Sequence, residues 1–298
     1  MTFAGLAIPA DHTKMNKETL PNIGSIATAE IDGLLIRFAR MGVSKGIPIL
    51  LTSPWPESIY SFYRLAPQLA NRHPLTLVDL PGFGLSQSRP DVMSPEAMGN
   101  FLIRIFNHFG LDRMHIVAPD VGTPAVLFAA LKQHDLFESL IIGGAAMQPD
   151  LAGGSLKDLI YSPEGSLAEI GSNGVQPYLE HAALITPAAI IEDFRNASAG
   201  RRLEEATQYV RGYIQDCPKL EPGLPNIKTP ALIISGKNDT IVPPVNGQFL
   251  ADRLPNSRYR LLDAEHRVWE EAATEYIEAI SSWVEGDYHL LEKKSNSK

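Results

Sequence analysis

Apolar and polar residues alternate along this chain in blocks that predict strands and helices in turn. Short continuous apolar runs are typical of strands buried on both faces of a parallel sheet. The residues between these runs follow a helical period instead, as in the run 95–109, where apolar residues recur every three or four positions. The predicted strands cover residues 47–52, 75–80, 114–119, 139–144, 230–236 and 258–263. The predicted helices cover residues 58–71, 95–109, 123–133 and 267–283. This alternation predicts a mostly parallel, doubly wound α/β sheet with right-handed crossovers.

Two short patterns predict local structure more sharply. Residues 26–40 hold two strand-like runs around Asp32-Gly33, a pair of residues that favours the tight turn of a β-hairpin. Ser94 and Pro95 are suited to the start of a helix, and Gly110 is suited to its end. We therefore expect a hairpin ahead of the parallel strands and a well-delimited helix over 95–109.

The alternation stops over residues 148–226, and this break predicts the domain organisation. The segment is rich in glycine and proline at first and helical later, which indicates a small helical cap inserted between two strands. The core is then expected to comprise residues 25–147 and 227–284. Residues 1–24 show no periodicity and are interpreted as an N-terminal extension, and residues 285–298 as a loose C-terminal tail.

Composition narrows the class of protein without naming a function. Of the 298 residues, 44% are hydrophobic and 20% charged, the formal net charge is −8, and Lys and Arg do not cluster. We expect no nucleic-acid partner and no anionic membrane surface. No apolar run approaches the roughly 20 residues that span a bilayer, and the N-terminus lacks the pattern of a signal peptide. With Cys217 as the only cysteine, a cytoplasmic location is expected, while the choice between monomer and homodimer stays open.

Residues that can take part in catalysis follow several of the predicted strands. Asp120 follows the strand 114–119, Asp239 stands shortly after the strand 230–236, and His266 shortly after the strand 258–263. Ligands of open α/β sheets bind beyond the carboxyl ends of the strands. We therefore expect the two carboxylates and the histidine to meet at one edge of the sheet.

The order nucleophile, acid, histidine, with a cap before the acid, resembles the α/β-hydrolase fold over roughly residues 25–284. "APDVGTP" matches the nucleophile elbow, with Asp120 in the nucleophile slot and Gly122 where close helix packing is needed. "SGKND" and "LDAEHRVWEE" place Asp239 and His266 where this fold keeps its acid and its base. "SPWPES" resembles the "HGWPES" oxyanion loop of epoxide hydrolases. The resemblance implies the aspartate-nucleophile branch, which includes epoxide hydrolases and haloalkane dehalogenases.

An aspartate in the nucleophile slot points to a particular reaction. A carboxylate is already an anion at neutral pH, and its attack on a tetrahedral carbon with a leaving group gives an alkyl ester. His266, oriented by Asp239, can then activate water against that ester. The backbone N–H groups of Trp55 and Val121 are expected to hold the oxyanion. This chemistry acts on a small-molecule substrate and implies no metal and no organic cofactor.

The leaving group separates the possible reactions. An epoxide gives an alkoxide that takes a proton, which in epoxide hydrolases comes from cap tyrosines. Tyr209 precedes Asp239 at a spacing similar to that of the second of these tyrosines, and Tyr213 follows it on the same helix face. The candidates for the first tyrosine and for further substrate contacts are Tyr161, Tyr178 and His181, and Trp269 is interpreted as a core residue or a pocket wall. Val121 stands where haloalkane dehalogenases carry Trp and haloacetate dehalogenases carry Arg, so the resemblance favours an epoxide hydrolase.

Two alternatives remain open at this stage. One is a dehalogenase with the same covalent mechanism. The other is a degenerate hydrolase that binds a small molecule, because Ser53-Pro54 replaces the usual His-Gly and Pro119 replaces the usual His before the nucleophile. Pro54 also removes an amide donor from a loop that presents amides. The sequence leaves the identity of the substrate open under each hypothesis.

Overall fold

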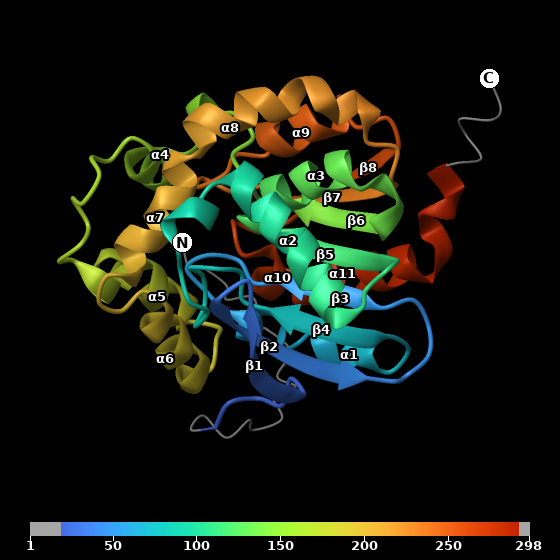
Figure 1. Cartoon of the computed structure of the whole chain (residues 1–298), viewed down its shortest axis with the longest axis horizontal. Helices are drawn as coiled ribbons and strands as arrows, with labels where there is room; N and C mark the ends of the chain where they lie inside the picture. Colours follow the sequence, from blue (N-terminus) through green and yellow to red (C-terminus); the bar gives the residue numbers. More distant parts are fainter. Residues whose placement is uncertain (1–18, 292–298) are drawn as a thin grey trace, which may run out of the picture.

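The strands of this protein form one eight-stranded sheet (Figure 1). The computed structural model describes residues 19–291. The order across the sheet is β1-β2-β4-β3-β5-β6-β7-β8, antiparallel from β1 through β2 to β4 and parallel between all other neighbours. The strands cover Ser25–Ile31 (β1), Leu34–Gly42 (β2), Ile49–Thr52 (β3), Pro74–Val78 (β4), Met114–Pro119 (β5), Phe137–Gly143 (β6), Ala231–Gly236 (β7) and Ser257–Leu262 (β8).

This sheet confirms the predicted α/β architecture. Each of the six predicted buried runs overlaps a strand, and no strand end differs from the prediction by more than two residues. Strands β3, β5, β6 and β7 are buried at every position, as expected where helices cover both faces of a parallel sheet. The edge strand β1 is mostly exposed. The buried centre of the sheet is therefore a rigid base for any residue that follows these strands.

The predicted hairpin and its turn are also confirmed. Ile31 of β1 pairs with Leu34 of β2, so only Asp32 and Gly33 form the turn. Both have positive φ, 50° and 78°, which is the conformation that a two-residue turn of this kind requires.

The helices follow the prediction in part. They cover Ala66–Ala70 (α1), Pro95–Phe109 (α2), Gly122–Lys132 (α3), Gly154–Ile160 (α4), Gln176–Ala182 (α5), Ala188–Ala197 (α6), Arg202–Arg211 (α7), Tyr213–Leu220 (α8), Val245–Ala251 (α9), Val268–Glu271 (α10) and Ala273–Ser282 (α11). Helix α2 has the predicted ends: the Ser94 side chain accepts the Ala97 amide, and Gly110 ends the helix with a φ of 65°. In Figure 1, α2 and α3 lie on one face of the sheet and α11 on the other.

Two helices predicted as continuous are broken. The prediction over 58–71 was wrong, because the chain forms a 3-10 turn, Ile59–Phe62, and then the short helix α1. Pro67 lies in the first turn of α1 and has no N–H to continue a longer helix. The helix predicted over 267–283 is divided into α10 and α11 at Ala272, whose φ of −120° and ψ of 47° are not helical.

Five short helices, α4 to α8, lie between β6 and β7 and correspond to the segment in which a helical cap was predicted. We call residues 148–226 the α4–α8 segment. In Figure 1 its helices α4 to α7 lie beside the sheet, and α8 runs back over it. Asp193 and Thr186 of this segment are buried and Tyr178 is half-buried, so the segment packs against other parts of the chain rather than projecting from them.

The ends of the described chain differ from the predicted extension and tail. Ile23, within the predicted N-terminal extension, is buried in the core. Tyr288, within the predicted loose tail, is also buried and donates its hydroxyl hydrogen to Glu138 at 2.6 Å. The tail prediction was therefore wrong at Tyr288, where an aromatic side chain finds a place in the core. Residues 1–18 and 292–298 lie outside the described part.

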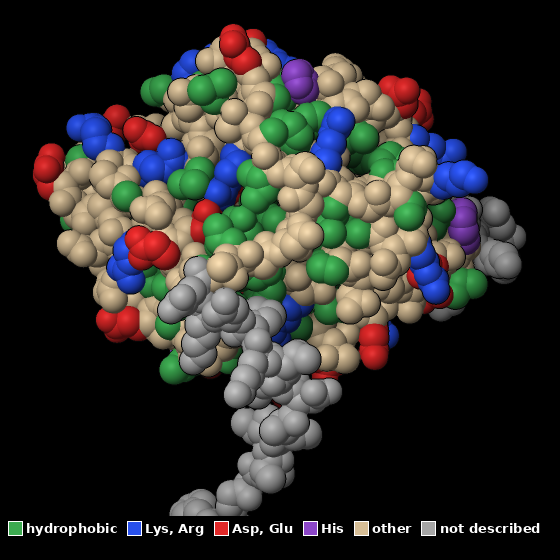
Figure 2. Space-filling view, turned by 90° about the horizontal axis from the view of Figure 1, so that it is seen from below, with side chains coloured by type: hydrophobic (Ala, Val, Ile, Leu, Met, Phe, Trp, Pro, Cys, Tyr) green, Lys and Arg blue, Asp and Glu red, His purple; other side chains and the backbone are tan. Residues whose placement is uncertain are grey.

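The surface is mixed in charge. Acidic and basic side chains are interspersed over the face shown in Figure 2, with apolar side chains between them. Within residues 19–291, no helix is both long and apolar enough to cross a membrane.

Candidate active site

The nucleophile elbow is a sharp corner between β5 and α3. Asp120 occupies this corner with a φ of 52°, a left-handed conformation that few residues other than glycine adopt. Its amide donates to the Gly143 carbonyl at 2.7 Å, and its carbonyl accepts the Thr123 amide at 2.9 Å. A Cβ atom at Gly122 would lie 2.3 Å from Thr52 Oγ1, so the close approach of α3 to the sheet requires glycine. The geometry predicted for "APDVGTP" is present.

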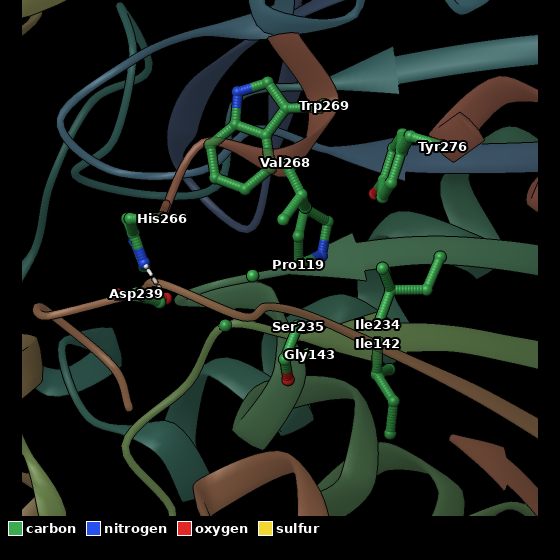
Figure 3. Close-up of a pocket in the computed structure, with 12 residues that line it drawn as sticks. Pro119, Ile142, Gly143, Ile234, Ser235, Asp239, His266, Val268, Trp269 and Tyr276 are labelled. Atoms are coloured by element: carbon green, nitrogen blue, oxygen red, sulfur yellow. Dashed lines mark hydrogen bonds and ion pairs between the residues drawn. The ribbon is translucent and has the colours of Figure 1, made fainter. Parts of the chain in front are cut away.

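His266 and Asp239 lie beside this corner, as the strand ends predicted. His266 Nδ1 lies 2.8 Å from Asp239 Oδ2, a hydrogen bond drawn in Figure 3. The other oxygen of Asp239 accepts the amides of Ile241 and Val242 at 2.8 and 2.7 Å, which fixes the carboxylate. His266 Nε2 then lies 4.0 Å from Asp120 Oδ1. The structure therefore brings the three residues together in the order carboxylate, imidazole, carboxylate, and all three are buried.

Of the two amides expected in an oxyanion hole, the Trp55 amide reaches the Asp120 carboxylate itself. The Trp55 amide donates to Asp120 Oδ2 at 2.7 Å. The Val121 amide, next in the chain, lowers the pKa of Asp120. The Trp55–Pro56 peptide bond is cis. One carboxylate oxygen thus accepts the Trp55 amide, and the other lies toward the imidazole.

Burial and charge shift the pKa values of both partners. Burial raises the pKa of Asp120 to about 6, although the His266 charge and the two amides oppose that rise. Burial disfavours the charged form of His266, but the Asp239 and Asp120 carboxylates outweigh it and raise its pKa to about 9. At neutral pH the resting site therefore holds an imidazolium between two carboxylates.

The predicted tyrosines occupy four different environments. Tyr209 is fully buried and donates its hydroxyl hydrogen to the Val121 carbonyl at 2.6 Å, so it supports the elbow from behind. Tyr213 packs edge-on against Tyr209 with ring centroids 5.7 Å apart. Within residues 19–291, no hydrogen bond joins the Tyr213 hydroxyl to another residue. Burial and then the nearby Tyr209 and Asp120 raise the pKa of Tyr213, which places its hydroxyl within the field of the Asp120 carboxylate.

Tyr178 and Tyr161 also differ in the group that accepts their hydroxyl hydrogen bond. Tyr178 donates its hydroxyl hydrogen to Glu57 at 2.7 Å within the protein interior. Tyr161 is 51% exposed and donates to Asp150 at 3.2 Å. The structure therefore places Tyr161 at the surface, apart from the residues around Asp120. His181 is exposed as well and lies 3.6 Å from Glu265.

A buried group of charges beside His266 was missed by the sequence analysis. Glu57, fully buried, accepts hydrogen bonds from Arg267 at 2.7 Å and from the Trp269 indole at 2.9 Å. Arg267 also pairs with Glu270. Trp269 packs edge-on against His266, with ring centroids 6.0 Å apart, which supports its interpretation as a pocket wall and a core residue. One feature of the sequence pointed to this group of charges: Arg267 directly follows the predicted catalytic residue His266.

A cavity of about 10 Å³ lies next to His266, and Figure 3 shows the residues that line it. Pro119, Gly143, Asp239 and Trp269 form parts of its wall. This volume holds about one water molecule.

One group of side chains within residues 19–291 has the composition of a metal site. His181, Glu265 and Glu271 bring one ligand atom each to within 4.8 Å of one another. Exposed acidic groups of this kind are common without a metal, and we assign the group no role in the chemistry below.

The sheet topology and the strained elbow together define a protein of the α/β-hydrolase fold. A family model described as alpha/beta hydrolase fold matches residues 47–159. Uncharacterized hydrolase YugF of Bacillus subtilis (strain 168) is 26% identical over 240 residues, which are 76% of this chain and 86% of YugF. Soluble epoxide hydrolase of Corynebacterium sp. (strain C12) is 27% identical over 114 residues, 38% of this chain and 39% of that protein.

Among solved structures, the enol-lactonase from Burkholderia xenovorans LB400 superposes with a TM-score of 0.70 at 18% identity. The match covers 87% of this chain and 99% of the enol-lactonase. The similar proteins thus share a fold and differ in the reactions that their names state. The reaction of this chain has to be argued from its own site.

Proposed function

We propose that this protein is a hydrolase that uses Asp120 as its nucleophile and converts a small organic epoxide to a diol. The observation that carries the proposal is the carboxylate at the corner of the elbow, 4.0 Å from His266 Nε2 and held by the Trp55 amide. A carboxylate needs no base to become a nucleophile. The similarity of 114 residues of this chain to a soluble epoxide hydrolase supports this choice among the reactions of the fold.

In the first step, Asp120 Oδ1 attacks one carbon of the epoxide ring. A C–O bond to that carbon forms, and the ring C–O bond breaks with its electron pair on the epoxide oxygen. That oxygen takes a proton from a tyrosine of the α4–α8 segment. The product of this step is an alkyl ester of Asp120, which has lost its negative charge.

In the second step, His266 takes a proton from water, and the resulting hydroxide attacks Cγ of the ester. The negative charge then develops on Asp120 Oδ2, the oxygen that already accepts the Trp55 amide. Collapse of this intermediate breaks the bond between Cγ and the ester oxygen, and that oxygen takes the proton held by His266 as the diol leaves. The Asp120 carboxyl then passes its proton to His266, which restores the carboxylate and the imidazolium. Formation of the ester removes a charge that raises the pKa of His266, so before this step the imidazolium can lose its proton, which returns through solvent to the tyrosinate left by the first step.

We propose Tyr213, rather than Tyr209, as the proton donor. The Tyr209 hydroxyl donates to Val121 and would have to leave that carbonyl before it could protonate an epoxide oxygen. The Tyr213 hydroxyl has no such partner within residues 19–291 and lies in the field of Asp120. We therefore assign proton donation to Tyr213 and support of the elbow to Tyr209. In this proposal the α4–α8 segment acts as the cap.

A dehalogenase of the same covalent type is the second candidate. The Trp55 indole N–H is buried, and no acceptor meets it within residues 19–291. The backbone of Trp55 contacts Asp120, and an indole N–H on this residue suits a departing halide as well as an epoxide oxygen. Both candidates share the ester of Asp120, and the mass of that ester separates them.

The test is a trapped intermediate. His266→Gln should form the ester but hydrolyse it slowly, because the glutamine side chain cannot take a proton from water. His266→Gln is incubated with styrene oxide and, separately, with chloroacetate, and its intact mass is then measured. We expect the mass of a whole epoxide to be added to the protein. A halogen-free fragment added instead would select the dehalogenase. His181→Gln, an exposed histidine of similar size, is the matched control and should accumulate no adduct.

Digestion should place the adduct on the peptide that contains Asp120. The double variant Asp120→Ala/His266→Gln should give none. A folded His266→Gln protein that forms no adduct across a broad panel of epoxides and halides would contradict the covalent mechanism and favour a ligand-binding protein that lacks catalysis.

A further inference from the structure

The loop 53–61 offers the active site very few amides. The Ser53 amide donates to the Val78 carbonyl, and the Glu57 amide donates to the Pro54 carbonyl. Proline at positions 54 and 56 provides no N–H at all. Among residues 53–57, Trp55 alone has an amide free for the site, and it donates to Asp120. The position of this one amide therefore decides how well the loop stabilises charge on Asp120.

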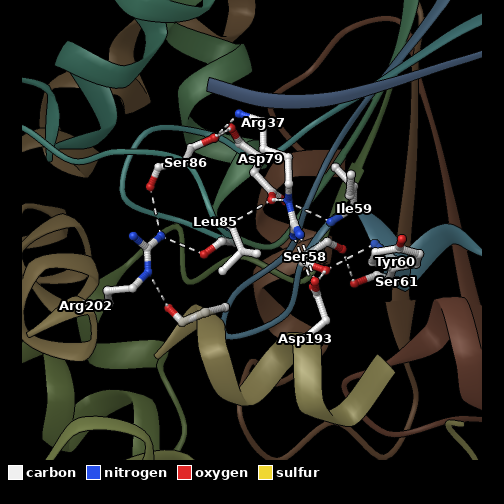
Figure 4. A network of polar contacts seen from close by, with 12 residues as sticks. Arg37, Ser58, Ile59, Tyr60, Ser61, Asp79, Leu85, Ser86, Asp193 and Arg202 are labelled. Carbon is white, nitrogen blue, oxygen red and sulfur yellow. Dashed lines mark hydrogen bonds and ion pairs between the residues drawn. The ribbon is translucent and has the colours of Figure 1, made fainter. Parts of the chain in front are cut away.

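The α4–α8 segment holds this loop through Asp193 of α6, as Figure 4 shows. Asp193 Oδ1 accepts the Ser58 hydroxyl at 2.5 Å. The two Asp193 oxygens also accept Arg37 Nη1 and Nη2 at 2.7 and 3.0 Å, a bidentate pair. Asp193, Ser58 and Arg37 are all buried. Charge-assisted bonds in such an environment fix the geometry of the groups that make them.

The core holds the same loop from the other side. Asp79, fully buried, accepts the Ile59 amide at 2.8 Å and Arg37 Nε at 2.5 Å. Arg37 therefore joins two carboxylates, one from the core and one from the α4–α8 segment, and each carboxylate binds the loop. Without Asp193 the loop would keep its contact with Asp79 but lose the contact at Ser58.

We propose that Asp193 positions the Trp55 amide toward Asp120, so that packing of α6 against the core completes the oxyanion hole. Asp193 touches neither the substrate nor a reacting atom, and it acts through Ser58 and the loop. This role rests on the proposed function for its catalytic meaning, whereas the ordering of the loop is a structural effect that can be measured without a substrate.

The first measurement is hydrogen–deuterium exchange of the peptide that covers residues 53–62. In Asp193→Ala, Arg37 keeps Asp79 as a partner, and we expect exchange in this peptide to accelerate by about tenfold or more through local opening. Glu192→Ala is the matched control, because Glu192 is an exposed neighbour on the same helix, and it should leave the exchange unchanged. Ser58→Ala removes the contact from the loop side and should reproduce the effect if Asp193→Ala does not fold.

The second measurement distinguishes a role of Asp193 in positioning the Trp55 amide from a general structural role. With styrene oxide in single turnovers, hydrolysis of the Asp120 ester should slow by about 10²-fold in Asp193→Ala, as for loss of one oxyanion donor. Formation of the ester should slow less than about tenfold, because charge on Oδ2 falls in that step. Asp193→Asn keeps an oxygen for the Ser58 hydroxyl and should recover part of the rate.

The outcomes test the positioning role of Asp193 and the proposed reaction at Asp120 separately. Unchanged exchange in the 53–62 peptide of folded Asp193→Ala and Ser58→Ala overturns the positioning role. An equal loss in both half-reactions also overturns it and indicates a general structural role. Faster exchange in a protein whose wild type forms no ester with any probe supports the positioning of the loop and rejects the proposed reaction.

Discussion

The corner around Asp120 and the α4–α8 segment differ in how their polar residues are held. Asp120, Asp239 and His266 each follow a parallel strand, and the sheet brings them together. The tyrosines of the α4–α8 segment lie on short helices or at the end of one, and each hydroxyl has a different environment. One donates to the elbow, one to Glu57 and one to a surface carboxylate, while Tyr213 has no partner within residues 19–291.

This difference indicates which polar groups have positions fixed by the sheet and which have positions that substitutions can change. Residues at the ends of parallel strands share one edge of the sheet whatever the sequence between them. The hydroxyls of the α4–α8 segment are placed by side-chain packing, which a few substitutions can change. We therefore expect large effects at the corner and graded effects in the α4–α8 segment.

The largest effect is expected for Asp120→Ala. Without the carboxylate no ester can form, and the turnover number should fall by at least about 10⁴-fold, as when other enzymes lose a nucleophile. Steady-state rates with an epoxide probe check this. Asp158→Ala, an exposed aspartate on α4, is the control and should keep full activity. Retention of activity by a folded Asp120→Ala protein would mean that the corner is not the site of reaction.

A comparison of Tyr213→Phe with Tyr209→Phe tests the assignment within the α4–α8 segment. Loss of the proton donor should lower the rate of ester formation about 10²-fold in Tyr213→Phe. Tyr209→Phe leaves the buried Val121 carbonyl without its partner, so we expect it to lower the free energy of unfolding by about 1–3 kcal/mol. Single-turnover rates and denaturant unfolding of both variants make the comparison. The opposite pattern, with the larger rate loss in Tyr209→Phe, would transfer proton donation to Tyr209.

The sequence predicted the corner well because each of its signals is local. The apolar run 114–119, the aspartate after it and Gly122 fix an elbow without reference to distant residues. The limits of α2 follow from Ser94 and Gly110 for the same reason. The break at Pro67 also has a local signal, because proline has no N–H to continue a longer helix.

The buried ion pairs could not be predicted, because their partners are far apart in the chain. Arg267 lies beside a predicted catalytic residue, but nothing near it in the sequence shows that Glu57 neutralises it. Arg37 likewise meets Asp193 only when α6 packs against β2 and the loop after β3. The roles of Tyr209 and Tyr213 depend on such packing as well, so their spacing along the helix did not distinguish them.

The pH dependence of ester formation should show whether the charge of His266 acts on Asp120. Protonated Asp120 is not a nucleophile, so the rate of ester formation should fall tenfold per pH unit below the pKa of about 6. The His266 charge lowers the pKa of Asp120, so His266→Gln should move this acid limb to higher pH. Adduct formation measured over pH 4 to 9 in both proteins is the test. An acid limb at the same pH in both would show that the imidazolium does not act on Asp120.

The smallest effect is expected for Tyr161→Phe. Its hydroxyl is at the surface and donates to Asp150 at 3.2 Å, so its removal should change neither the site nor the core. We expect kcat/KM to change by less than about twofold and the free energy of unfolding by less than about 0.5 kcal/mol. Steady-state kinetics beside Tyr213→Phe give the comparison directly. A loss of tenfold or more would mean that α4 moves over Asp120 during turnover and carries Tyr161 with it. The distinction between a fixed corner and an adjustable α4–α8 segment would then extend to motion as well as to packing.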